Sequence, residues 1–183
     1  MLYQKRRTRD LILTIVSSIL IGVFALAVAL AAREERIAQF QATAVVHPSG
    51  LARVTEVIDY DFGAKSRHGI YRDIPGLLSA DSVKVESATA PASFQIIGLG
   101  NRTRMRIGDA NKKIRGRHRY RIEYDLLVRG FDAVSGEDLG WNAIGTGWNV
   151  EITNIEIHVL AKSRLDNVFA VKGTESSDNT IPI

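Results

Sequence analysis

The sequence of 183 residues contains no cysteine. Disulfide bonds, cysteine nucleophiles and thiolate metal ligands are therefore excluded, and a folded domain here must be stable through its core alone. Three common active-site motifs are also missing: the Gly-x-Ser-x-Gly nucleophile elbow, the P-loop and the glycine pattern of dinucleotide-binding folds. We therefore expect no catalytic residue and no cofactor.

Histidine is scarce. The four histidines lie in separate predicted turns and strands: His47, His68, His118 and His158. None has the short spacing to another that zinc ligands show, so no metal site is expected.

Long apolar stretches are rare too, apart from one at the start of the chain. Leu11 to Ala32 carries no charge over 22 residues and follows the basic cluster Lys5, Arg6, Arg7 and Arg9. As a helix it would reach about 33 Å, enough to cross a hydrocarbon core of about 30 Å. The residues just after it balance two arginines with two glutamates, so the positive-inside bias favours a cytoplasmic N-terminus and an extracytoplasmic remainder.

A cleaved secretory signal is the alternative interpretation of this run. Small residues at Ala27 to Ala29 or Ala29 to Ala31 would suit a signal peptidase. The run is longer than an ordinary signal core of about 7 to 15 residues, which favours an uncleaved membrane anchor. Both interpretations place the remainder outside the cytoplasm, at the cell membrane or secreted from it.

Net charge nearly vanishes once the N-terminus is set aside. Of 24 basic and 20 acidic residues, four basic and one acidic residue precede residue 33, which leaves 20 against 19. An exported, nearly neutral domain has little reason to bind nucleic acid, so no nucleic-acid partner is expected.

Beyond the connector, apolar and polar residues alternate, with Val, Ile and Tyr frequent and Gly, Pro, Asn and Asp between the runs. This pattern predicts strands joined by turns. The predicted strands are Gln39–His47, Leu51–Phe62, Asp81–Thr89, Ser93–Ile97, Arg102–Ile107, Arg117–Val128 and Thr153–Ala161. In the last of them Ile155, Ile157, Val159 and Ala161 share one face, which we expect to be buried.

Seven strands without an intervening amphipathic helix favour an all-β fold, an antiparallel immunoglobulin-like β-sandwich preceded by one N-terminal hydrophobic helix. The expected segments are a basic cytoplasmic flank (1–10), a transmembrane anchor or signal segment (11–32), a connector (33–37), the extracytoplasmic β-sandwich (38–172) and a loose tail (173–183).

Arginines are concentrated between Asn101 and Tyr124. Two predicted strands each place them on one face, and together they resemble a hairpin with an arginine-lined outer surface; the residues are Arg102, Arg104, Arg106, Arg115, Arg117, Arg119 and Arg121. Because like charges across neighbouring strands repel each other, such a row needs negatively charged partners. It could be internal, from Glu56, Asp59 and Asp61, or external, from anionic lipid or an acidic envelope polymer.

Two further segments form a candidate loop site. In Gly69–Pro75, Arg72 could clamp a carboxylate or phosphate with Asp73 orienting it, or it could tie a loop carbonyl or Asp73 while Ile70 and Ile74 fill the core. The second segment, Leu139–Trp148, holds both tryptophans and is rich in glycine. Its residues Trp141, Asn142 and Trp148 could close the core or present rings to a sugar.

Several short motifs, in this order behind an export segment, resemble the DUF2207 family of predicted bacterial membrane proteins. They are Val54-Thr55-Glu56-Val57-Ile58 ending in Phe62, the segment Gly69–Pro75, Gly116-x-His118-x-Tyr120-x-Ile122-x-Tyr124, and Leu139-x-Trp141-Asn142-x-Ile144-Gly145-x-x-Trp148. The resemblance covers about Ile37 to Lys162 and implies an extracytoplasmic all-β domain anchored to the membrane, with no assigned catalytic residues. Members usually continue into further transmembrane helices, so this chain is expected to be a fragment or a shortened member.

The sequence thus supports three hypotheses. The first is a non-enzymatic membrane-anchored domain that binds or organises something at the envelope, with the arginines as its surface. The second is a module that recognises a protein partner within a larger membrane assembly. The third is an envelope hydrolase with loop carboxylates, which would need a concave pocket near Arg72 and Trp141 and a shifted carboxylate pKa.

Overall fold

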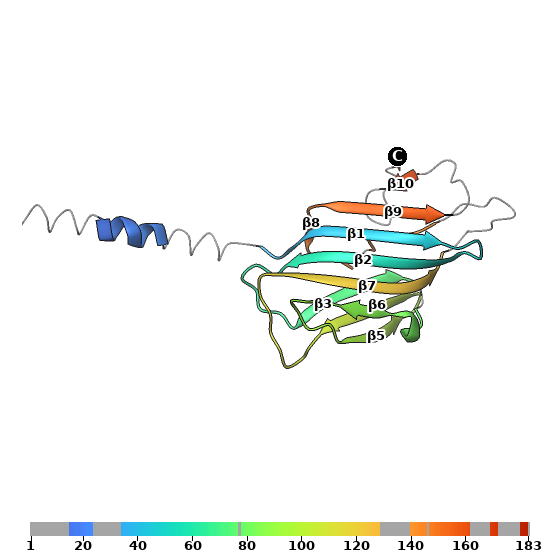
Figure 1. Cartoon of the computed structure of the whole chain (residues 1–183), viewed down its shortest axis with the longest axis horizontal. Helices are drawn as coiled ribbons and strands as arrows, with labels where there is room; N and C mark the ends of the chain where they lie inside the picture. The colour runs from blue at the N-terminus through green and yellow to red at the C-terminus, as the bar shows by residue number, and fades with distance from the viewer. Residues whose placement is uncertain are drawn as a thin grey trace, which may run out of the picture.

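The computed structural model describes residues 15–23, 34–76, 78–128, 140–145, 147–161, 169–171 and 180–182. Residues 15–23 are helical, and the rest is built mainly of strands (Figure 1). The strands are β1 (Arg36–Val46), β2 (Leu51–Asp61), β3 (Gly69–Pro75), β4 (Lys84–Glu86), β5 (Phe94–Leu99), β6 (Arg102–Gly108), β7 (Arg117–Leu127), β8 (Glu151–Ile152), β9 (Ile155–Ala161), β10 (Phe169–Val171) and β11 (Thr180–Pro182), with a 3₁₀ turn, η1, at Ala80–Ser82.

The described part of the N-terminal apolar run is a short helix. Within the described residues, no helix combines the length and the apolar character needed to span a bilayer. Residues 11–14 and 24–32 of the expected anchor lie outside the described residues.

The strands of the described residues form a six-stranded sheet, a three-stranded sheet and a separate pair. The larger sheet has the order β4-β7-β2-β1, and both β8 and β9 pair with β1; the smaller sheet has the order β3-β6-β5. Strands β10 and β11 pair with each other. Of the loose tail expected at residues 173–183, only 180–182 are described, as β11; residues 173–179 and 183 lie outside the described residues. The all-β expectation is confirmed by this inventory.

The long strands have one apolar face each. In β2, every second side chain from Ala52 to Tyr60 is buried, and β7 repeats the pattern from Tyr120 to Leu126. Since neighbouring side chains on a strand point to opposite faces, this period of two turns one face of the sheet toward the core.

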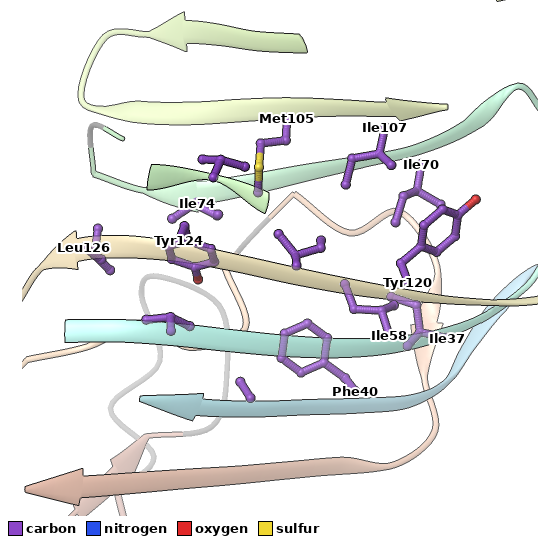
Figure 2. Packing of buried hydrophobic residues seen from close by; sticks show 14 of the residues in the cluster. Ile37, Phe40, Ile58, Ile70, Ile74, Met105, Ile107, Tyr120, Tyr124 and Leu126 are labelled. Atoms are coloured by element: carbon purple, nitrogen blue, oxygen red, sulfur yellow. The ribbon is translucent and has the colours of Figure 1, made fainter. Parts of the chain in front are cut away.

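Both sheets contribute to one hydrophobic cluster (Figure 2). The six-stranded sheet supplies large side chains such as Phe40, Ile58 and Tyr120, and the three-stranded sheet supplies Ile74 and Met105. The three-stranded sheet therefore covers the apolar face of the larger one.

The expectation that all strands pair antiparallel is wrong for β8 and β9, which run parallel to β1. Strands β7 and β1 point in the same direction because each is antiparallel to β2. The connection from residue 128 to residue 150 returns the chain to the start of β1, and a parallel pairing needs such a long crossover.

The predicted arginine hairpin is also wrong. Strand β6 pairs with β3 and β5, whereas β7 pairs with β2 and β4, so the two arginine-rich strands belong to different sheets. The chain does reverse direction between them, but the apolar faces of β6 and β7 pack into the shared core instead of joining edge to edge.

Three smaller predictions also change. Gly69–Pro75, interpreted as a loop, is strand β3, and only Lys84–Glu86 of the predicted strand Asp81–Thr89 is a strand. In β9, Val159 and Ala161 are partly buried, but Ile155 is 49% and Ile157 36% exposed. Strand β9 pairs with β1 at the edge of the sheet, so the face expected to be buried is only partly covered.

Candidate functional site

A buried ion pair joins the two sheets. Arg72 lies on β3 between Ile70 and Ile74, and Glu56 lies on β2 between Val54 and Ile58. Both charged side chains therefore occupy positions that the strand period turns toward the core. Arg72 is 1% exposed and Glu56 is fully buried.

The guanidinium of Arg72 has a protein acceptor for each of its five N–H groups. Nε donates to Glu56 Oε2 at 2.8 Å and Nη2 to Glu56 Oε1 at 2.7 Å, which makes the pair bidentate. Nη2 also donates to the carbonyl of Ala143 and Nη1 to that of Ile144, each at 2.9 Å, and Nη1 donates to the carbonyl of Asp73. Because a guanidinium has five donors, its hydrogen-bonding capacity is fully used.

Tyr124 on β7 completes the polar cluster. Its hydroxyl donates to Glu56 Oε1 at 2.6 Å. Burial and the adjacent carboxylate raise the pKa of Tyr124 well above its ordinary value, so the phenol stays protonated as a donor. Burial lowers the pKa of Arg72, but the charge and hydrogen bonds of Glu56 outweigh it and raise that pKa overall. The cluster is a charged arginine beside a carboxylate that three donors satisfy.

The described residues of the glycine-rich segment 140–148, called here the tryptophan loop, contact Arg72 directly. A Cβ on Gly145 would lie 2.6 Å from Arg72 Nη1 and 2.7 Å from the Asp73 carbonyl, and the φ of Gly145 is 75°. A Cβ on Gly147 would lie 2.6 Å from Asp73 Oδ2. Glycine is therefore required where the loop meets β3.

Aromatic rings enclose the guanidinium. The Cζ atom of Arg72 lies 5.5 Å from the ring centroid of Phe40 and 5.6 Å from that of Trp148, within the range of cation–π contacts. The two rings meet edge to face at 6.3 Å, and Trp148 Nε1 donates to the Ile144 carbonyl at 2.9 Å. The rings shield the ion pair from water.

Asp73 makes a second bidentate pair, on the outer side of β3. It lies opposite Arg104 in the β3–β6 register, and Nε and Nη2 of Arg104 each donate to one carboxylate oxygen at 2.6 Å. The hydrogen bonds from Arg104 lower the pKa of Asp73 below its ordinary value. Asp73 is therefore an ionised carboxylate, 6% exposed, held between Arg104 and the tryptophan loop.

Four of the five candidate loop residues meet in this arrangement. The guanidinium of Arg72 lies over the Trp148 ring and donates to the carbonyl of Asp73. Within the loop, Asn142 accepts a hydrogen bond from the Gly145 amide at 2.8 Å. Trp141 packs against the core cluster, as Trp148 also does. The arrangement matches the structural alternative for Arg72, which ties two loop carbonyls and that of Asp73.

Sequence reasoning missed that Glu56, Tyr124 and Phe40 belong to this cluster. A signal was present for Glu56, which is the one charged residue on the otherwise apolar face of β2. The sequence also allows Glu56 to be a partner for the arginine row, but its carboxylate binds Arg72.

The seven arginines of the expected row divide into paired and unpaired groups. Arg104 pairs with Asp73, Arg119 makes a bidentate pair with Asp59 at 2.6 Å, Arg121 pairs with Glu123 at 2.7 Å, and Arg117 lies 3.8 Å from Asp61. Several of the arginines therefore have carboxylate partners within the domain, and these partners include Asp59 and Asp61, the internal candidates that the sequence offers. Arg102, Arg106 and Arg115 have no carboxylate within salt-bridge distance among the described residues.

The geometry of the cluster suits a structural role better than a catalytic or ligand-binding one. Arg72 cannot bind a ligand without giving up a protein acceptor, and the lowered pKa of Asp73 is opposite to that of a general acid. Across the described ranges, no group of three or more His, Asp or Glu residues is arranged to hold a metal ion.

Comparison with known families gives a match over most of the chain. Residues 36–181 match the family model described as "Predicted membrane protein (DUF2207) N-terminal domain". No curated protein matches the chain.

Comparison with solved structures gives distant likenesses to parts of larger enzymes. The M1 zinc metallopeptidase from Deinococcus radiodurans is 10% identical over 55% of this chain and 22% of its own, with a TM-score of 0.36. An inactive mutant of the GH20 exo β-N-acetylglucosaminidase from Vibrio harveyi is 11% identical over 78% of this chain and 20% of its own, with a TM-score of 0.37. The chain spans about a fifth of the length of each of these enzymes.

Proposed function

Because the chain belongs to the DUF2207 family of predicted membrane proteins, through the N-terminal domain of that family, we propose that it is a non-enzymatic, membrane-anchored binding domain. In this proposal the apolar run at residues 11–32 anchors the chain with its N-terminus in the cytoplasm. Residues 38–172 lie on the extracytoplasmic side, where they bind or organise a component of the cell envelope.

One observation carries the non-enzymatic part of the proposal: Arg72 uses all five of its donors within the protein. The hydrolase hypothesis needed Arg72 and the tryptophan loop to line a concave pocket. The loop instead lies against Arg72 and Asp73, with no room for a Cβ at Gly145 or Gly147. We propose that this cluster fastens the loop to the sheets, and that binding takes place elsewhere on the surface.

The type of fold is part of the same proposal. We infer that the two sheets pack as an immunoglobulin-like β-sandwich, supported by the single cluster to which both contribute apolar side chains. Such a domain presents its loops at two ends, which suits a binding role.

Membrane retention and sidedness test the proposal. The full chain should stay in the membrane pellet after alkaline carbonate extraction, and alkaline phosphatase fused after Ile183 should be active. Release into the carbonate supernatant together with an inactive fusion would overturn it. Cleavage near Ala31 would give a released protein with an active fusion, which would replace the anchored form by the secreted one.

A second candidate function is recognition of a protein partner at a sheet edge. In the described part of the chain β5 pairs with β6 alone, and its residues Ile97 and Leu99 are 40% and 37% exposed. An extended segment could add to such an edge. Pull-down from solubilised membranes at high salt should retain a partner of this kind, whereas a purely electrostatic ligand should be lost.

A further inference from the structure

We propose that the end of the domain that receives the connector lies against anionic lipid headgroups of the membrane that anchors it. This inference rests on the membrane anchor of the proposed function and names the partner of one surface. That surface, called here the basic end, consists of Arg36, Lys65, Arg67, Lys112, Lys113, Arg115 and Arg117.

Strand register gathers these residues at one end of the domain. Arg36, at the start of β1, pairs with Asp61 at the end of β2, which pairs in turn with Arg117 at the start of β7. The loops 62–68 and 109–116 leave both sheets at this end, as the left side of Figure 1 shows. A bridge between Arg67 and Ile114 joins the two loops, with backbone hydrogen bonds of 3.1 and 2.8 Å.

The connector is fixed to this same end. The Glu35 side chain is 7% exposed and lies 2.7 Å from Arg67 Nη2 and 3.3 Å from Lys65 Nζ, and it accepts a hydrogen bond from the Tyr60 hydroxyl at 3.0 Å. Glu35 stands three residues after Ala32, the last residue of the apolar run. Three residues span at most about 11 Å, while the headgroup layer beside the hydrocarbon core is about 5 to 7 Å thick. The basic end is therefore held at or next to headgroup level when the run lies in the bilayer.

Charge at this end is only partly balanced. Glu35 neutralises part of the Lys65 and Arg67 charge, and Asp61 lies 3.8 Å from Arg117. Other described acids also lie near this end: Glu34, Asp59, Asp109 and Glu151, the last of which lies opposite Arg36 in the β1–β8 register. Four exposed members have no carboxylate within salt-bridge distance among the described residues: Arg36, Lys112, Lys113 and Arg115. Each basic residue near an anionic bilayer strengthens association about fivefold, so four such residues make a substantial contribution.

An open hollow at this end has the composition of a headgroup site. It has a volume of about 360 Å³, and its lining includes Arg36 and Arg117 together with the amides of Gln39 and Asn154. Asp59 also lines it, but both of its carboxylate oxygens accept hydrogen bonds from Arg119. The guanidinium groups of Arg36 and Arg117 and the amide of Gln39 can donate to a lipid phosphate. The Asn154 amide has one N–H left for this, since its Nδ2 also donates to the Ala38 carbonyl at 3.1 Å.

The opposite end of the domain supplies matched controls. Arg102 lies at the far end of β6, opposite Pro75, and like Arg115 it is exposed and has no salt-bridge partner among the described residues. Ser49 lies in the turn between β1 and β2, whereas Ala110 lies in the loop 109–116 at the basic end. Strands of 11 residues separate the two ends by about 35 Å.

The absence of cysteine permits a direct test with single labels. The full chain carrying Ala110→Cys or Ser49→Cys is labelled with a fluorophore and reconstituted into vesicles of phosphatidylcholine, with or without phosphatidylglycerol, that contain a headgroup-attached quencher. In the anionic vesicles we expect loss of fluorescence from the Ala110→Cys label and none from the Ser49→Cys label. The loss should shrink in neutral vesicles and at 1 M salt, where the screening length falls to about 3 Å.

Charge-reversal variants then test whether the basic residues make the contact with the bilayer. Arg115→Glu should reduce the quenching of the Ala110→Cys label in anionic vesicles, and Arg102→Glu should leave it unchanged. Equal quenching of the two labels, or equal effects of the two charge reversals, would overturn the inference while leaving the anchor intact. A full chain that fails to float with either kind of vesicle would refute the anchor, and the proposed function with it.

Discussion

Arg72 and Glu56 meet inside the core as a bidentate pair, with Nε–Oε2 and Nη2–Oε1 distances of 2.8 and 2.7 Å. One residue comes from each sheet, and the tryptophan loop supplies two further acceptors to the arginine. The pair therefore connects three parts of the domain that are distant in sequence. Removing either charge would leave the other buried without its partner.

The first prediction concerns this pair. Arg72→Met and Glu56→Met should each lower the free energy of unfolding by roughly 3 to 5 kcal/mol, because each leaves the other charge buried without its partner. Arg72→Lys should also destabilise, since an ammonium group cannot replace the five-donor fork. The measurement is urea unfolding in detergent, followed by circular dichroism.

The double variant Arg72→Met with Glu56→Met is the internal control. It removes both charges, so its cost should be clearly less than the sum of the two single costs. Additive single effects would mean that the two side chains contribute independently to stability, and that their ion pair does not hold the two sheets together.

Much of the fold could be predicted from the sequence because its long strands alternate cleanly. The period of two in Leu51–Asp61 and Arg117–Leu127 marks both strands and their buried faces. The pairing of the strands, by contrast, could not be predicted in full. The separation of β6 from β7, and the parallel position of β9, depend on which apolar faces meet in three dimensions, and no local pattern encodes that.

The site was predictable in its parts and not in its assembly. The segment Gly69–Pro75 shows Arg72 flanked by Ile70 and Ile74 at strand spacing, which is the pattern of an inward-facing charge once the segment is a strand. A loop at this position, as expected from the sequence, would not point Arg72 into the core. The partner Glu56 lies 16 residues earlier on another sheet, and its alternation with Val54 and Ile58 was the signal available.

The second prediction concerns Gly145. Gly145→Ala should destabilise the domain for two reasons: its φ of 75° disfavours a side chain, and its Cβ would meet Arg72 Nη1 at 2.6 Å. Gly100→Ala is the matched control, since Gly100 has a φ of 66° with nothing within 4 Å of the added Cβ. The control should cost about 1 to 2 kcal/mol from backbone strain alone.

In a Trp141→Phe background, the emission of Trp148 should shift to the red in Gly145→Ala and stay unchanged in Gly100→Ala, because the loop carrying the ring would move away from Arg72. Equal costs in the two variants with no change in emission would show that the loop does not depend on this close approach.

The third prediction concerns pH and Asp73. Hydrogen bonds from Arg104 lower the folded-state pKa of Asp73 below its ordinary value of 3.8. A carboxylate with a lowered folded pKa stabilises the fold above its ordinary pKa, and this contribution is lost as pH falls toward and through the folded pKa. The stability difference between the native chain and Asp73→Asn should therefore be constant above about pH 5 and shrink below about pH 4.

Unfolding by urea at several pH values measures this difference. Asp81→Asn serves as the control, because Asp81 is an exposed carboxylate in η1 without an ion pair among the described residues. A difference for Asp73→Asn that stays flat down to pH 3 would contradict the role assigned to the Arg104 pair.

The fourth prediction compares two tyrosines on β7. Tyr124 and Tyr120 are both fully buried, but the hydroxyl of Tyr124 donates to the Glu56 carboxylate at 2.6 Å, whereas that of Tyr120 has no hydrogen-bond partner among the described residues. Burial raises the pKa of Tyr120 to about 12, so this hydroxyl also stays protonated. The two side chains differ in whether their polar atom is satisfied.

Removing the Tyr124 hydroxyl should therefore lower stability, and removing the Tyr120 hydroxyl should not. Tyr124→Phe should lower the free energy of unfolding by about 1.5 to 3 kcal/mol, the usual value of a hydrogen bond to a charged group. Tyr120→Phe removes a desolvated donor that gains nothing in the fold, so the variant should be as stable as the native chain or more stable. Thermal and urea unfolding of the two variants side by side make the measurement. A loss of similar size in both would mean that the Tyr120 hydroxyl is bound in the folded protein and that the ion pair does not depend on Tyr124 in particular.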